Sequence, residues 1–109
     1  MPRKSPKSVA GSGNVFADPG FRNAEEMSAK AELVRRINRI IQERELTQVK
    51  AAGILKTSQP NISLLRSGSL IDFSMDRLMR YLVALGQEVR IETGPAARPG
   101  LKVMRADAA

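Results

Sequence analysis

The stretch LTQVKAAGILKTSQPNISLLRSG, residues 46–68, is rich in hydrogen-bonding side chains and carries charge of one sign only. It contains three basic residues and no acidic residue. Amide and hydroxyl groups beside unopposed cations suit the binding of an anion, because a carboxylate on the same surface would repel that anion. The stretch therefore predicts a binding surface rather than a catalytic site.

The composition of the whole chain supports the same chemistry. In 109 residues, 18 Lys and Arg outnumber 11 Asp and Glu, which gives a formal charge of +7. This charge favours a polyanion or an acidic partner, and nucleic acid is the first candidate. The chain has no Cys and no His, so it offers neither a thiolate nor an imidazole base or metal ligand. We therefore expect no enzyme activity, no metal site and no cofactor.

The length fits one small domain near the lower limit for a self-sufficient core, which favours stabilisation by a partner chain. No apolar run could span a bilayer, and no signal-peptide segment follows the basic N-terminus, so we expect a cytoplasmic protein that does not enter membranes. Residues 1–13 are predicted to form a disordered basic arm, which either contacts a partner or serves only as a solubilising tail. The domain is expected at residues 14–93, followed by a flexible tail at 94–109.

Apolar periodicity predicts four helices. The first begins near Asn23, its expected cap, and continues for about five turns to Arg44. The second covers about residues 47–55, the third runs from 58 or 59 to about 67, and the fourth begins at the cap Ser74 and ends before Gly86. The apolar residues assigned to the core are Leu33, Val34, Ile37, Ile40, Ile41, Val49, Ala52, Leu55, Ile62, Leu65, Met75, Leu78, Met79, Leu82, Val83 and Leu85.

After Gly86 the apolar period changes from that of a helix to that of a strand. In QEVRIET, Val89 and Ile91 alternate with charged residues, which predicts a β-strand over residues 87–93. A strand needs a neighbour to satisfy its backbone. That neighbour is either the extended segment at Val15-Phe16 or the same strand of a second subunit, which would make the protein a homodimer.

The second and third helices, joined by about three residues, predict a helix-turn-helix. Ala52 stands where the two helices cross and only a small side chain fits, while Ile62 and Leu65 lie on the inner face of the third helix. Pro60 is tolerated in the first turn of that helix, where its missing N–H has no intrahelical partner. The fold class is therefore mainly α.

Residues 47–68 resemble the helix-turn-helix of the lambda-repressor/Cro superfamily, the XRE family of regulators. Gln48 opens the second helix, Ala52 follows four residues later, and Ser58 and Gln59 open the third. The flanking segments NVFADPGFRNAEE and SMDRLMRYLVALGQEVRIE are similar to HigA-type antitoxins, which neutralise RelE/HigB-like toxins. The resemblance covers about residues 14–93. It implies a four- to five-helix lambda-repressor-like domain with a C-terminal β-strand used in dimerisation.

The chain departs from the family pattern at the turn. The family usually has Gly where this chain has Lys56, and an aliphatic residue where it has Thr57. A left-handed conformation at Lys56 would cost about 1 kcal/mol relative to Gly.

The resemblance also implies a sequence-specific repressor of its own operon that reads an inverted-repeat operator in double-stranded DNA. The third helix would enter the major groove by its N-terminal end, so its first two turns would meet base edges. The expected base-reading residues are Gln59, Asn61 and Ser63. The expected phosphate contacts, which set register without reading sequence, are Thr47, Gln48, Lys50, Lys56, Ser58 and Arg66.

A small basic RelE/HigB-like toxin would need an acidic surface. The expected toxin-binding residues are Asp18, Glu25, Glu26 and Glu32. Two alternatives remain open at this point: a stand-alone XRE-type repressor without a toxin, and a nonspecific basic nucleic-acid-binding protein.

Overall fold

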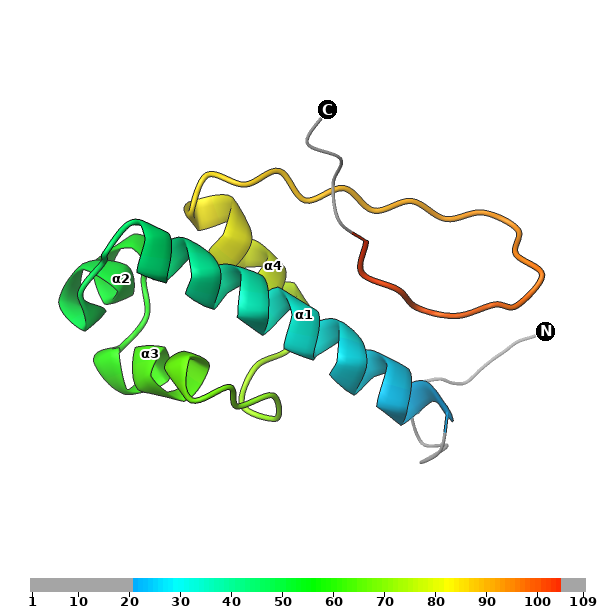
Figure 1. The fold of residues 1–109 in the computed structure, drawn as a ribbon, viewed down its shortest axis with the longest axis horizontal. Coiled ribbons are helices and arrows are strands. Elements are labelled where there is room, and N and C mark those ends of the chain that lie inside the picture. The colour runs from blue at the N-terminus through cyan, green and yellow to red at the C-terminus, as the bar shows by residue number, and fades with distance from the viewer. Residues whose placement is uncertain (1–20, 105–109) are drawn as a thin grey trace.

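The computed structural model describes residues 21–104, which contain four helices (Figure 1). These are α1 (Phe21–Glu43), α2 (Gln48–Leu55), α3 (Gln59–Arg66) and α4 (Met75–Ala84). All four predicted helices are therefore confirmed, although α1 begins at Phe21 and places the expected cap Asn23 inside the helix. The basic arm at 1–13, the Val15-Phe16 segment and Asp18 lie outside the described residues, as does the end of the tail. None of the helices in residues 21–104 is long and apolar enough to cross a membrane.

A hydroxyl group caps the N-terminus of each of the three short helices. In each case the cap is extended in backbone conformation and its side-chain oxygen accepts a hydrogen bond from the backbone N–H three residues later. Such a bond satisfies a donor that the helix itself leaves free, and is worth about 1 kcal/mol. The pairs are Thr47 with Lys50 at 3.1 Å, Ser58 with Asn61 at 3.3 Å, and Ser74 with Arg77 at 3.1 Å.

Helix α1 is the longest helix, and α3 and α4 pack along its C-terminal half, while α2 packs against α3 and α4 (Figure 1). Its apolar face meets the inner faces of the short helices in one core, as the periodicity predicts. The largest side chains with almost no exposed surface are Ile37, Ile41, Ile62, Leu65, Phe73, Leu78 and Leu85. Burial of each such side chain contributes roughly 1.5–3 kcal/mol by removing apolar area from water.

Two residues assigned to the core are exposed instead. Val49 is 62% exposed and Val83 is 58% exposed. The reason is helical rotation: at roughly 100° per residue, Val49 lies on the far side of α2 from the buried Ala51, and Val83 is turned well away from the buried Leu78. Conversely, Phe73 precedes α4, outside any helical period, and is almost fully buried.

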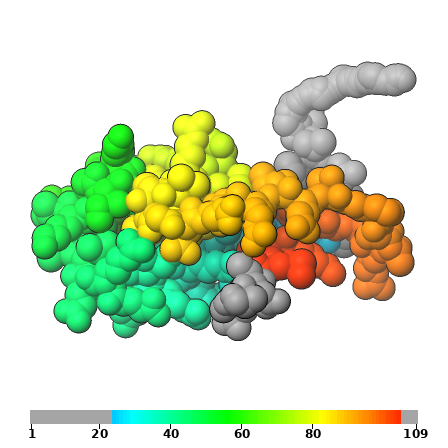
Figure 2. Space-filling view, turned by 90° about the horizontal axis from the view of Figure 1, so that it is seen from above, coloured from blue at the N-terminus to red at the C-terminus, as the bar shows by residue number. Residues whose placement is uncertain are grey.

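The β-strand predicted at residues 87–93 is not formed. Residues 87–104 instead follow an irregular path on the surface of the molecule and return to the N-terminal half of α1 (Figures 1 and 2). A strand exists only when another segment pairs with its backbone, and within residues 21–104 no segment does so. Consequently Val89 packs partly against the core while Ile91 is 75% exposed.

Candidate nucleic-acid interface

The turn between α2 and α3 contains a residue in the left-handed conformation. Lys56 is left-handed, with φ 56° and ψ 48°, at the position where the family usually has Gly. Its backbone N–H and that of Thr57 both donate to the carbonyl of Ala52, which closes the end of α2. The small buried side chains of Ala51 and Ala52 let the two helices approach. The turn is therefore formed despite the Lys side chain.

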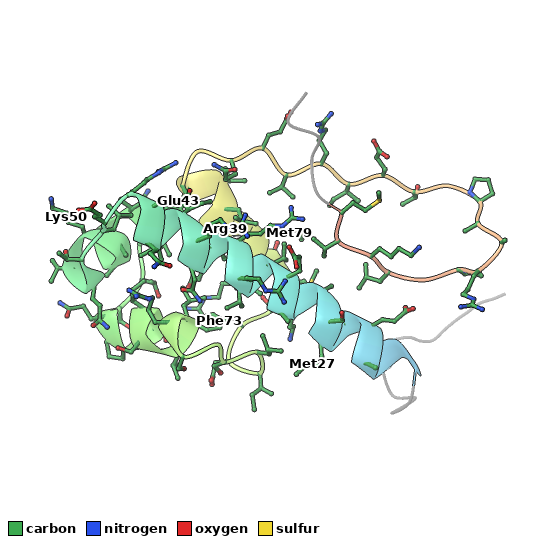
Figure 3. The ribbon with its side chains drawn as sticks, in the orientation of Figure 1. Met27, Arg39, Glu43, Lys50, Phe73 and Met79 are labelled. Carbon is green, nitrogen blue, oxygen red and sulfur yellow. The ribbon has the colours of Figure 1, made fainter. Side chains whose placement is uncertain are left out.

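The residues predicted to contact DNA lie on the α2–α3 surface. Gln59 and Ser63 are exposed on α3, whereas Asn61 is half-buried. Lys50 stands at the outer edge of α2 (Figure 3). All the predicted phosphate contacts are exposed: Thr47, Gln48, Lys50, Lys56, Ser58 and Arg66. Their contacts with DNA stay predictions.

The positive charges on this surface have no carboxylate partner in the part of the chain that the structure describes. None of the ion pairs in residues 21–104 involves Lys50, Lys56 or Arg66. In addition, α3 has no acidic residue in its first turn, so the positive end of its dipole is left to an external anion. Unpaired cations and the positive ends of helix dipoles are groups that bind a phosphate backbone.

Asn61 has a neighbour that sequence reasoning missed. Its Nδ2 donates to Thr57 Oγ1 at 2.8 Å, and Arg77 Nη2 reaches the same oxygen at 3.5 Å from the first turn of α4. Arg77 is 20 residues from Thr57 in sequence, so only the packing of α4 against α2 brings them together. No local pattern indicates this contact.

Helix α1 also holds the far ends of α3 and α4. Asn38 Nδ2 donates to the carbonyl of Leu65 at 2.8 Å, and Arg44 Nη2 donates to the carbonyl of Leu85 at 2.7 Å. Asn38 thus faces the last turn of α3 rather than solvent, although its side chain is polar. The bond from Arg44 satisfies a carbonyl at the end of α4, and the bond from Asn38 adds to the one that the Leu65 carbonyl accepts from the backbone N–H of Gly68 at 3.0 Å.

Three acidic residues of α1, which are Glu25, Glu26 and Glu32, have partners within the protein. Glu26 pairs with Lys30 at 3.5 Å, and Glu25 Oε1 accepts a hydrogen bond from the backbone N–H of Leu101 at 3.1 Å. Glu32 accepts from Arg36 Nε at 2.9 Å and also pairs with Arg35. The hydrogen bond from Arg36 is the main reason that the pKa of Glu32 lies below its usual value. The structure thus places these three carboxylates along one helix, each with a partner.

Comparison with known proteins places this geometry in a family. Residues 15–94 match the model of a helix-turn-helix domain, and the chain belongs to that family. A solved structure described as a proposed XRE family transcriptional regulator is 36% identical, with a TM-score of 0.68, over 79% of this chain and 99% of that chain. No curated protein matches the sequence at a significant level.

Proposed function

We propose that the chain is a sequence-specific DNA-binding transcriptional regulator of the XRE type. The observation that carries this proposal is the α2–α3 surface, on which most amides and hydroxyls are exposed and none of Lys50, Lys56 and Arg66 pairs with a described carboxylate. Membership of the helix-turn-helix family and likeness to the XRE-type structure support it. Such a regulator acts in the cytoplasm, and we propose no enzymatic activity.

In the proposed complex, α3 lies in the major groove with its N-terminal end toward the bases. Gln59, Asn61 and Ser63 then meet base edges, and an amide is suited to bond adenine through both its oxygen and its nitrogen. The hydroxyls and cations at the starts of α2 and α3 bind phosphates on either side of the groove. These contacts fix the register and supply affinity that falls with salt.

Selection of binding sites from a library of random duplexes tests this function. A specific regulator enriches one sequence, and binds it about 4 kcal/mol or more tightly than scrambled DNA of the same length at physiological salt. Equal affinity for both duplexes, with the same steep salt dependence, would instead support a nonspecific basic nucleic-acid-binding protein.

We propose that the regulator binds an inverted repeat as a homodimer, because one module of this size makes few contacts and a two-fold dimer doubles them. The segment at 87–93, whose backbone has no strand partner within residues 21–104, is the proposed seam. Ile91→Asp should lower the mass measured by sedimentation, and its exposed position leaves the monomer fold intact. A dimer that persists in Ile91→Asp would remove this segment from the interface.

A finer proposal is that the chain is the antitoxin of a type II toxin–antitoxin pair. The flanking segments that resemble HigA-type antitoxins support it. The paired state of Glu25, Glu26 and Glu32 means that a small basic RelE/HigB-like toxin must displace existing partners to use them. Co-expression with the native neighbouring genes, followed by affinity capture and mass spectrometry, tests this proposal. Capture of a small basic protein that halts growth when expressed alone supports it, whereas recovery of only the chain and DNA leaves a stand-alone repressor.

A further inference from the structure

Arg77 is an exposed cation whose position is nevertheless fixed by its neighbours. Its guanidinium carbon lies 5.6 Å from the centre of the Phe73 ring and 5.8 Å from that of the Tyr81 ring, and the two rings meet edge to face. Both rings are buried, so they form a rigid support. Guanidinium groups are attracted to aromatic rings at such distances. The side chain is therefore held at the start of α4 rather than free in solvent.

The positive charge of Arg77 has no described carboxylate partner. The adjacent Asp76 pairs with Arg80 at 3.2 Å, on the same helix, and none of the ion pairs in residues 21–104 includes Arg77. A guanidinium that is supported on one side and unpaired on the other retains donors for a phosphate oxygen.

Thr57 links this cation to the recognition helix. Its Oγ1 lies 2.8 Å from Asn61 Nδ2 and 3.5 Å from Arg77 Nη2, so one hydroxyl faces both α3 and α4. The hydrogen bond commits one hydrogen of the Asn61 amide. The other hydrogen and Oδ1 remain, and these are the two groups that an amide presents to N7 and N6 of adenine.

We propose that Asn61, Thr57 and Arg77 act as one DNA-reading unit. Thr57 is a positioning residue that holds the Asn61 amide in the orientation that reads adenine, and Arg77 binds the backbone phosphate beside that base. This inference rests on the proposed function and specifies how part of its surface works. It adds Arg77 and Thr57, from α4 and the turn, to the residues expected on α2 and α3.

The positioning role is tested with Thr57→Val, which removes the hydroxyl and keeps the shape, and with Thr57→Ser, which restores the hydroxyl. The probes are the duplex selected by the wild type, its single-base variants and a scrambled duplex. Thr57→Val should bind the selected duplex about tenfold more weakly, lose its preference at one A·T pair, and bind scrambled DNA as the wild type does. Thr57→Ser should recover the preference. Unchanged preference at every position in Thr57→Val would overturn the positioning role.

The phosphate role is tested with Arg77→Gln, for which Arg39→Gln is the matched control. Arg39 is an exposed cation of α1, turned by roughly 200° from the buried Ile37 and outside the described ion pairs. Arg77→Gln should weaken binding to the selected and scrambled duplexes alike and reduce the salt slope by about one, whereas Arg39→Gln should change neither. Equal salt slopes for the two variants would overturn the phosphate contact.

Two further measurements keep the outcomes separable. Because Arg77 also packs on two rings, thermal unfolding of each variant is followed, and Arg77→Lys, which keeps the charge, should retain most of the salt slope even where stability falls. If the wild type enriches no sequence, the proposed function fails. If it enriches one and the Thr57 and Arg77 variants read it as the wild type does, only this inference fails.

Discussion

Two surfaces of this small domain differ in whether their charged side chains form ion pairs. On the α2–α3 surface, Lys50, Lys56 and Arg66 have no described carboxylate partner. On the N-terminal half of α1, Glu26 and Glu32 each pair with a basic side chain three or four residues away. The first surface has no counter-charge among the described residues, whereas the second contains its own.

The difference separates two kinds of partner. A polyanion gains the full attraction of unpaired cations and releases counterions when it binds. A basic partner that binds α1 must compete with Lys30, Arg35 and Arg36 for the carboxylates. These three residues lie on the same helix as the carboxylates, so little entropy is lost when they pair. We therefore expect charge changes on the two surfaces to have very unequal effects on DNA binding.

The largest effect is expected from a carboxylate placed in the acid-free surface. Ser63→Asp should reduce affinity for the selected duplex about a hundredfold, because the new charge would face the phosphates in the groove. Its matched control is Ser28→Asp, at an exposed Ser on the acidic half of α1, which should leave affinity nearly unchanged. Fluorescence anisotropy at fixed salt measures both. Similar losses in the two variants would show that only net charge matters.

An intermediate effect is expected at the turn. Lys56 and Glu45 are the two non-glycine residues among those described with positive φ, at 56° and 53°. Replacing either by Gly should raise the free energy of unfolding by about 1 kcal/mol, because the left-handed conformation strains a side chain. Only Lys56→Gly should also weaken DNA binding, by about fivefold, because it removes a phosphate contact. Equal DNA affinity in the two variants would place Lys56 outside the interface.

The smallest effect is expected from Glu32→Gln. The pKa of Glu32 is lowered in the folded protein, first by its hydrogen bond with Arg36, from an ordinary value of 4.5. Its contribution to stability is therefore present above about pH 4.5 and is lost as the pH falls through the lowered pKa. Urea unfolding of wild type should show a small loss of stability in that acid range that Glu32→Gln lacks. Parallel pH profiles would mean that the pair contributes nothing measurable, as many exposed pairs do.

Most of the fold was readable because its causes are local. The starts of the three short helices depend on hydrogen bonds between residues only three positions apart, made by Thr47, Ser58 and Ser74. A short window of sequence therefore contains the signal for each start. The apolar period of α1 and the turn after Leu55 are local signals of the same kind. The left-handed Lys56 was anticipated as a possibility because the turn geometry demands it of whichever residue stands there.

The misses have long-range causes. Asn38 and Arg44 bond carbonyls 27 and 41 residues away, and Arg77 reaches Thr57 from another helix, so no window of sequence contains both partners. Val83 was assigned to the core by its spacing and Val49 as part of the wedge between α2 and α3, whereas the rotation of these short helices turns both to solvent. The strand at 87–93 was predicted from a two-residue alternation, which describes a half-buried surface but does not supply the neighbour that makes a strand.

The shortness of α2 and α3 has a consequence for how the domain folds. Each has eight residues, too few to persist as an isolated helix in water, since nucleation costs more than so few bonds return. Both helices are therefore stabilised by packing: α2 packs on α3 and α4, and α3 also packs on α1, which holds its end through Asn38. The backbone amides of α3 should therefore exchange with solvent deuterium only when α1 detaches, at a rate close to that of complete unfolding. The α2–α3 surface therefore forms and unfolds together with the whole domain.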